Sequence, residues 1–188
     1  MYNIKEKMTG LVKFPLQYCR VTSHGKEVIK PIPKLMGWQT LKRSVPIDVE
    51  LGQGVGVVTG KTSGITVVDF DDEVIHQKVV TRHPVFRETP RQKTPNGYHY
   101  IFRYDDIYPT RSFKQTTFEG MDIRNDGGCI ILEDHNYQEN VETGRRVYYK
   151  FLDEGKQMQS LPLEFYQELS EFLTTHTNDN NKIGRAHV

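Results

Sequence analysis

The sequence predicts one α+β domain built on a single mixed β-sheet. Segments rich in β-branched and aromatic residues alternate with turn formers through most of the chain, a pattern typical of strands. Two segments, 72–82 and 160–173, instead carry the apolar spacing of amphipathic helices. The 188 residues suffice for one domain with a full core and are too few for two.

The N-terminal part of the chain predicts strands and stiff connections. Residues 12–21 and 27–29 are expected to form two short strands, joined by a turn at 23–26. The prolines of segment 30–34 favour an extended backbone, because each restricts itself and the residue before it. That segment leads to Trp38, the only tryptophan of the chain.

The middle of the chain begins with a predicted hairpin. Residues 55–59 and 65–70 are expected to be strands joined by the glycine-bounded turn 60–64. Strand 65–70 is apolar on both faces, which indicates a central position in the sheet. A helix should follow, with Asp71 or Asp72 near its N-cap and a buried side formed by Val74, Ile75 and Val79.

The remaining strands and the last helix follow in order. Strands are expected at 98–104, 121–124, 129–132 and 146–151, with a hairpin turn at 126–128. Ser160 is expected to cap the final helix, which admits Pro162 in its first turn. The apolar stripe of this helix consists of Leu163, Tyr166, Leu169, Phe172 and Leu173.

Polar residues at the ends of these strands carry the functional signal. Asp69 and Asp71 end the apolar strand, and both point to one face because strand side chains alternate. The turn at 94–97 delivers His99 onto a second strand, and Asp122 lies on a third. Carboxylates from two strands can hold a pair of hard divalent ions. This pattern indicates phosphoryl or nucleotidyl transfer.

Each of these residues also has an ordinary structural explanation. Paired surface carboxylates such as Asp69 and Asp71 are common and are often only solvated. A single strand histidine such as His99 is more often a hydrogen-bonded structural residue, and Asp122 could simply pair with Arg124. The combination of the four residues, in this order, favours the metal-site hypothesis.

The glycine-bounded turn at 60–64 is not a P-loop. The spacing of Gly-x4-Gly-Lys-[Ser/Thr] is not satisfied, and a strand follows where a P-loop has a helix. The turn could place Lys61 and backbone amides near the carboxylates, where they would meet a phosphate. An exposed hairpin turn without such a role is the alternative.

Composition excludes several classes of protein. The chain has 25 Lys plus Arg against 24 Asp plus Glu, so nucleic acid could be bound only by a local basic patch. No signal peptide and no apolar stretch of membrane-spanning length is found, which predicts a protein of the cell interior that is not secreted. Cys19 and Cys129 lack metal-ligand spacing, so no zinc is expected, and both are expected to be reduced, buried thiols.

Three stretches, 56–71, 93–99 and 121–128, resemble in order the motifs of one enzyme family. This is the N-terminal prim-pol domain of bifunctional DNA primase/polymerases, a branch of the archaeo-eukaryotic primase superfamily. The resemblance runs from about residue 30 to about residue 133. It implies an RRM-like catalytic sheet with an N-terminal α/β unit packed against it, in a catalytic domain expected to span 1–175.

The resemblance also implies site residues. The metal-binding carboxylates of the family correspond to Asp69, Asp71 and Asp122, and its phosphate-contacting histidine corresponds to His99. The chain departs from many members in having one glycine before this histidine and no proline-ended strand after Gly128. The zinc-bearing insertion of some relatives is missing, which makes primer extension a firmer expectation than primer initiation.

The residue pattern and the resemblance together imply a DNA primase/polymerase that uses two Mg²⁺ or Mn²⁺ ions. Its substrates would be a primer on single-stranded DNA and dNTP or NTP, in viral or plasmid replication. A replicative helicase, as a C-terminal domain or a separate protein, is the partner that the resemblance implies. The expected nucleotide contacts are His99, Arg124, Lys61, Ser63 and Thr94. The template is expected along the open side of the sheet, near Tyr98, Arg103 and Tyr104. A metal-dependent nuclease and a catalytically silent single-strand-binding module are the rival hypotheses.

The C-terminal end is unusual. Residues 182–188 resemble one reading frame of a short-read sequencing adapter, and the polar stretch before them lacks core periodicity. We therefore expect 176–188 to be a disordered tail, 182–188 to be an artefact, and the natural chain to continue further. An ordinary disordered tail is the alternative.

Overall fold

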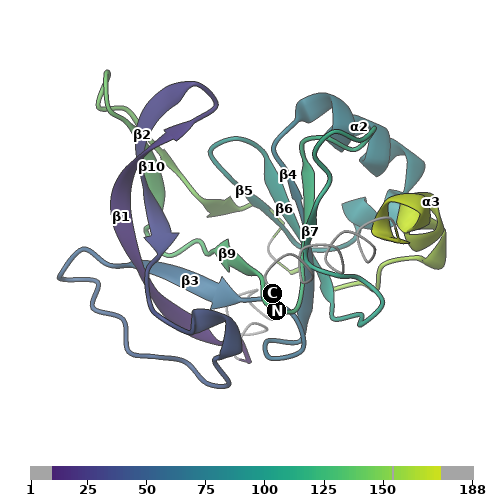
Figure 1. The fold of residues 1–188 in the computed structure, drawn as a ribbon, viewed down its shortest axis with the longest axis horizontal. Coiled ribbons are helices and arrows are strands. Elements are labelled where there is room, and N and C mark those ends of the chain that lie inside the picture. Colours follow the sequence, from purple (N-terminus) through teal and green to yellow (C-terminus); the bar gives the residue numbers. More distant parts are fainter. Residues whose placement is uncertain (1–9, 154, 175–188) are drawn as a thin grey trace, which may run out of the picture.

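The described residues form two antiparallel β-sheets and two α-helices that cover one face of the second sheet (Figure 1). The computed structural model describes residues 10–153 and 155–174. The first sheet has the order β11-β10-β2-β1-β3-β9. Its strands are β1 (Lys13–Ser23), β2 (Lys26–Pro33), β3 (Gly54–Val58), β9 (Cys129–Ile131), β10 (Tyr137–Asn140) and β11 (Arg146–Tyr148).

The second sheet has the order β12-β5-β6-β4-β8-β7. Its strands are β4 (Ile65–Phe70), β5 (Arg91–Lys93), β6 (Tyr98–Arg103), β7 (Arg111–Ser112), β8 (Met121–Arg124) and β12 (Lys150–Phe151). The α-helices are α2 (Glu73–Arg82) and α3 (Leu163–Thr174), and the short 3-10 helices are η1 (Trp38–Thr40) and η2 (Pro84–Arg87).

The α+β class is confirmed, but the prediction of one mixed sheet is wrong. The turns at 60–64 and 126–128 do not close hairpins within a sheet. The first carries the chain from β3 of one sheet to β4 of the other, and the second returns it from β8 to β9. Sequence periodicity shows that a segment is a strand, but it does not show which strand lies beside it.

The two crossing turns pack against each other. The hydroxyl of Thr59 donates a hydrogen bond to the Asn125 carbonyl at 2.6 Å, and the Lys61 backbone N–H donates to Asp126 Oδ1 at 2.8 Å. Gly60 has a left-handed φ of 86°, and a Cβ here would lie 2.6 Å from the backbone nitrogen of Asp126. This close approach needs glycine and holds the sheets together where the chain crosses.

Strand β4 contributes to two hydrophobic cores, as its apolar sequence predicts. Val67 belongs to the core between the two sheets, with Val57 of β3. Val68 and Phe70 belong to the core between the second sheet and the helices, with Phe165 of α3. β4 lies between β6 and β8, so the predicted central position is confirmed.

Helix α2 lies where the sequence predicts, but α3 begins at Leu163, three residues after the expected Ser160 cap. The Pro162 carbonyl accepts the first hydrogen bonds of α3, so Pro162 precedes the helix and does not lie in its first turn.

The buried faces of the two helices also differ from the expected ones. Asp72 caps α2 by accepting a hydrogen bond from the Ile75 backbone N–H at 2.9 Å. Val74, expected on the buried side, is 73% exposed, while His76 is buried. The His76 ring stacks on Tyr98 and shares a hydrogen bond with the Tyr100 hydroxyl at 2.8 Å, which allows a polar residue to enter the core.

The last helix shows a similar difference at its first residue. Leu163, expected in the apolar stripe, is 60% exposed, while Phe165 and Leu169 are fully buried. The spacing of apolar residues identifies the buried stripe of a helix, but it does not show which residues at the border of the stripe are exposed, because this depends on how far the underlying sheet extends.

The described part of the N-terminal unit, residues 10–58, lacks the α-helix of the expected α/β unit. Between residues 10 and 58, the only helical element described is the 3-10 helix η1, and the rest forms strands of the first sheet and loops. The expected domain end at 175, the tail 176–188 and the segment 182–188 lie outside the described residues. Cys19 and Cys129 are free and only half-buried. No helix in the described part of the chain is long and apolar enough to cross a bilayer.

Candidate active site

A row of polar side chains crosses the second sheet. Gln92, His99, Asp69, Asp122 and Ser112 are successive Cα partners on β5, β6, β4, β8 and β7. Directly opposite residues of antiparallel strands point to the same face. The register therefore brings together three of the four residues that the sequence singled out.

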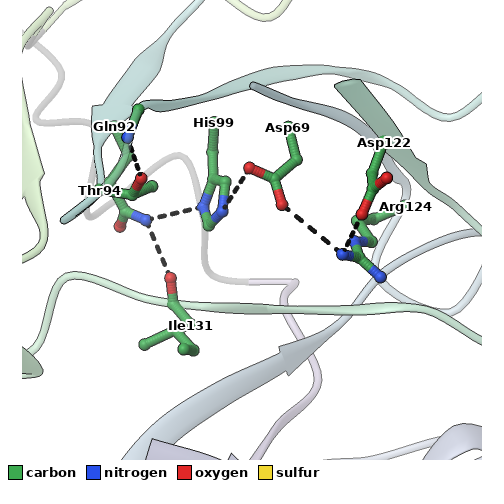
Figure 2. Close-up of polar contacts among 8 residues, drawn as sticks. Asp69, Gln92, Thr94, His99, Asp122, Arg124 and Ile131 are labelled. Carbon is green, nitrogen blue, oxygen red and sulfur yellow. Dashed lines mark hydrogen bonds and ion pairs between the residues drawn. The ribbon is translucent and has the colours of Figure 1, made fainter. Parts of the chain in front are cut away.

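Asp69 lies at the centre of this row. Its side chain is almost buried, with Oδ1 3.4 Å from His99 Nε2 and Oδ2 3.7 Å from Arg124 Nη2 (Figure 2). Burial by itself would raise the pKa of this carboxyl, but the contact with His99 and the charges of Arg124 and Lys30 lower the pKa below its ordinary value. Asp69 is therefore an anion in the folded protein at neutral pH.

Arg124 lies between two carboxylates. Its Nη2 is 2.5 Å from Asp122 Oδ2, closer than to Asp69 (Figure 2). The two residues of β8 are two positions apart and so share a face. The Asp122–Arg124 ion pair that was one alternative is thus formed, and it also reaches Asp69.

Asp71 lies one residue beyond the end of β4. Its backbone N–H donates a hydrogen bond to the Gly120 carbonyl at 2.8 Å, which ties the end of β4 to the start of β8. The pKa of the Asp71 carboxyl is raised, first by loss of hydration and then by the negative charge of Asp69. The two acids of the Asp-x-Asp motif thus have pKa values shifted in opposite directions.

A cavity of about 480 Å³ separates this row from the first sheet. Asp69, Asp71 and His99 line it from the second sheet. Lys30 of β2 and the buried Tyr149 also line it. Its volume is within the range of small-molecule sites.

Sequence reasoning missed three residues of this site. Lys30 appears in the sequence only as part of a stiff proline segment, yet its charge acts on Asp69. Burial and then the charge of Asp69 raise the pKa of Tyr149. Gln92 is fully buried and contacts His99. No spacing rule links these residues to the motifs, although Lys30 lies in a segment noted for its family resemblance.

Two expected nucleotide contacts lie away from the cavity. Lys61 and Ser63 precede β4, whereas Asp69 lies near the other end of this strand. At 3.3 Å per residue, Asp69 is about 13 Å from Ile65, the first residue of β4. The Ser63 hydroxyl accepts a hydrogen bond from the Val12 backbone N–H at 2.9 Å. The turn at 60–64 therefore lies where the chain crosses between the sheets and does not bring Lys61 to the carboxylates.

Thr94, in contrast, does line the cavity. Its hydroxyl accepts a hydrogen bond from the Gly97 backbone N–H at 2.9 Å, which closes the turn before His99. A Cβ on Gly97 would collide with the carbonyl oxygen of Phe70. This contact explains why glycine precedes the Tyr98–His99 pair and sets the position of the turn beside β4.

The residues expected along the template lie elsewhere. Tyr98 is adjacent to His99 in the same strand, so it points to the opposite face, where its ring stacks on His76 with centroids 4.5 Å apart. The Tyr104 hydroxyl donates to Asp126 Oδ2 at 2.8 Å. Arg103 is exposed, and none of the three lines the cavity. The helices cover the face that Tyr98 occupies, so this face is not open.

The donors partly fit a divalent cation. Asp69 Oδ1 is buried and makes no hydrogen bond, and carboxylate oxygens are the ligands that Mg²⁺ and Mn²⁺ prefer. Across residues 10–153 and 155–174, however, no group of three His, Cys, Asp or Glu side chains is arranged as a cation site. The guanidinium of Arg124 supplies positive charge between Asp69 and Asp122 instead.

Comparison with known proteins identifies the family. No curated protein sequence matches the chain. The family model for the N-terminal domain of bifunctional DNA primase/polymerase matches residues 25–164. The matched region begins at the β1–β2 turn, ends in the first turn of α3, and contains the whole polar row. The chain therefore belongs to the Prim-Pol family of bifunctional DNA primase/polymerase N-terminal domains.

Proposed function

We propose that this protein is a template-dependent nucleotidyltransferase that adds nucleotides to a primer on single-stranded DNA. The family places the chain among DNA primase/polymerases. The observation that carries the proposal is the direct pairing of Asp69 with both His99 and Asp122 on neighbouring strands, with Asp69 and His99 lining a cavity of about 480 Å³. Carboxylates beside a cationic, hydrogen-bonding wall suit a triphosphate and its metal ions.

In this proposal Asp69, Asp71 and Asp122 would hold two Mg²⁺ or Mn²⁺ ions. The ions, when bound, would activate the primer 3′-hydroxyl for attack on the α-phosphorus and stabilise the departing pyrophosphate. Asp69 would contribute its buried, unbonded Oδ1. Asp71, one residue beyond the end of β4, would contribute its carboxylate from the lining of the same cavity.

The phosphate contacts would come from both sheets. His99 and Arg124 lie beside the carboxylates on the second sheet, and Lys30 lines the cavity from the first sheet. Cations on both walls would hold the triphosphate between them and neutralise its charge during transfer. Thr94 would act indirectly, by holding the turn before His99, and Lys61 and Ser63 have no place in this set.

Primer extension tests the proposal. Wild-type protein, labelled primer–template DNA, all four dNTPs and Mg²⁺ or Mn²⁺ should give extended products, and Asp69→Asn or Asp122→Asn should abolish them. Asp106→Asn is the matched control, because Asp106 is exposed and lies outside the cavity. Extension by either variant within a few-fold of wild type would refute the assignment.

One rival is favoured by a specific observation. The guanidinium of Arg124 offsets part of the charge of Asp122 and Asp69 without a metal ion, as a catalytically silent single-strand-binding module would need. Calorimetric titration with Mn²⁺ decides between them, because the silent module would bind DNA without binding the ion. Cleavage of labelled DNA in the absence of nucleotides would indicate the other rival, a metal-dependent nuclease.

A further inference from the structure

A second cavity, of about 650 Å³, continues from the first. The two share the lining residues Pro95, Asn96 and Gln138. The second cavity is bounded by the β1–β2 turn and the β10–β11 turn, which project from the same end of the first sheet (Figure 1). We call it the hairpin groove.

The hairpin groove is positively charged. Its lining includes His24, Lys26 and Arg145 and contains no Asp or Glu. His24, at the tip of the β1–β2 turn, has a left-handed φ of 50° and lines the groove beside Lys26. The groove adjoins the proposed catalytic site through the lining residues that the two cavities share.

Neighbouring cations differ from those of the groove. Arg20 and Arg146, on the same sheet, are neutralised by Glu27 and Glu139 at 2.7 and 2.6 Å. Lys26 and Arg145 are exposed and have no ion pair within the part of the chain that the structure describes. Their charges are thus available to an external anion.

The turns that carry these cations are held in place. Asn140 Oδ1 accepts hydrogen bonds from the backbone N–H and the hydroxyl of Thr143, at 2.8 and 3.0 Å. The Val141 backbone N–H donates to the Glu27 carbonyl at 3.0 Å, which fastens the second turn to the first. The cations are therefore positioned on fixed backbone before any ligand arrives.

We propose that the hairpin groove binds the sugar–phosphate backbone of the single-stranded DNA that leads into the active-site cavity. The inference rests on the proposed function. Phosphodiesters suit the groove because a row of single charges matches Lys26 and Arg145, and the amides of Asn96 and Gln138 can donate to phosphate oxygens. The free triphosphate belongs to the first cavity, where the carboxylates lie.

Fluorescence anisotropy with a labelled single-stranded DNA oligonucleotide tests this assignment. The binding constant falls as salt rises, and the double variant Lys26→Ala/Arg145→Ala should make the slope of log affinity against log salt less steep by about 1.4, at roughly 0.7 per lost phosphate contact. At 0.1 M salt the same relation predicts about a fivefold loss of DNA affinity for each lost contact. Lys26→Glu/Arg145→Glu should weaken binding further.

The matched control is Arg20→Ala/Arg146→Ala, which removes the same charge from the same sheet but from residues that are already paired. It should change affinity and salt slope little. Equal losses of DNA affinity in the two double variants would overturn the proposal, because they would show that binding depends only on the net charge of the protein. Tighter binding of an RNA oligonucleotide of the same sequence would overturn the assignment to DNA.

Nucleotide binding separates this proposal from the proposed function. Affinity for dNTP, measured with Mn²⁺ by calorimetry, should be unchanged in Lys26→Ala/Arg145→Ala. If wild-type protein fails to extend primers but the double variant still loses DNA affinity, the groove stands and polymerisation is refuted. If wild type extends primers and the double variant binds DNA normally, the groove assignment is refuted.

Discussion

The side-chain amide of Gln92 determines which ring nitrogen of His99 carries the proton. Gln92 Nε2 lies 3.0 Å from His99 Nδ1 and also donates to the Ile131 carbonyl at 2.9 Å, while its Oε1 accepts from the Glu133 backbone N–H at 2.6 Å. The two backbone partners determine which end of the amide is the NH₂ group. His99 Nδ1 must therefore accept, and the ring proton lies on Nε2, facing Asp69 (Figure 2).

Replacing Gln92 by glutamate should move this proton. A carboxylate only accepts hydrogen bonds, so Gln92→Glu should place a proton on His99 Nδ1. Nitrogen-15 NMR of the imidazole reports this directly. Gln92→Met is the control that removes the amide without supplying an acceptor. An Nδ1 that is already protonated in wild type, or that stays unprotonated in Gln92→Glu, would contradict the assignment.

Neutralising the two acids of the Asp-x-Asp motif should have opposite effects on stability. The folded-state pKa of Asp71 is raised, so its charge opposes folding above its ordinary pKa, and Asp71→Asn should raise the melting temperature at pH 7 without metal. The folded-state pKa of Asp69 is lowered, so its charge favours folding, and Asp69→Asn should lower the melting temperature.

Calorimetry as a function of pH checks both signs. The stability that Asp69 contributes is present above the ordinary aspartate pKa, about 3.9, and is lost as pH falls through its lower folded-state pKa. The destabilisation by Asp71 should appear as pH rises through the ordinary value. Shifts of the same sign in both variants at pH 7 would show that the two environments have been assigned wrongly.

Removing the guanidinium of Arg124 should strengthen metal binding and weaken nucleotide binding. Its Nη2 lies between Asp122 and Asp69, so Arg124→Gln frees both carboxylates for a cation. In the wild type the ion must displace the guanidinium from Asp122, which costs a charge-assisted hydrogen bond of about 1.5 kcal/mol. Removing this cost should raise Mn²⁺ affinity roughly tenfold. Calorimetric titration with Mn²⁺ measures it, with Arg103→Gln, exposed and outside the cavity, as the control. A loss of Mn²⁺ affinity in Arg124→Gln would show that the guanidinium supports the metal site.

Replacing His99 by alanine should weaken nucleotide binding more than metal binding. Loss of a charge-assisted hydrogen bond costs about 1.5–3 kcal/mol, or roughly 10- to 150-fold in affinity. Titration of the folded fraction with dNTP measures this, and exposed His135, outside the first cavity, supplies the control variant His135→Ala. Unchanged nucleotide affinity with a lowered melting temperature would assign His99 a structural role only.

A methyl group on Gly97 should disturb the turn that positions His99. The Phe70 carbonyl occupies the space that the methyl needs, and such overpacking costs typically about 1–3 kcal/mol. Gly97→Ala should therefore melt roughly 2–12 °C below wild type, at about 2–4 °C per kcal/mol. Gly10→Ala is the control, because among the described residues, chain neighbours aside, no atom lies within 4 Å of its added methyl. Equal melting temperatures for the two variants would show that the turn can move without cost.

The sequence by itself determined the local elements and the order of the polar row. The apolar run before Asp69 required a central strand, and Asp72 capped the helix after it, because both signals depend only on neighbouring residues. Alternation along the strand was enough to put Asp69 and Asp71 on one face, and the order of the motifs marked His99 and Asp122 as candidates to join them. The motif spacing was enough to indicate the family.

Only the tertiary structure decided which strands became neighbours and which face lined the cavity. The chain crosses between two sheets at 60–64 and 126–128, which leaves Lys61 at the far end of β4 and brings Lys30 across the cavity from Asp69. Tyr98 faces the helices because it alternates with His99. Strand pairing is set by apolar surfaces buried between segments far apart in the chain, and local periodicity carries no record of that choice.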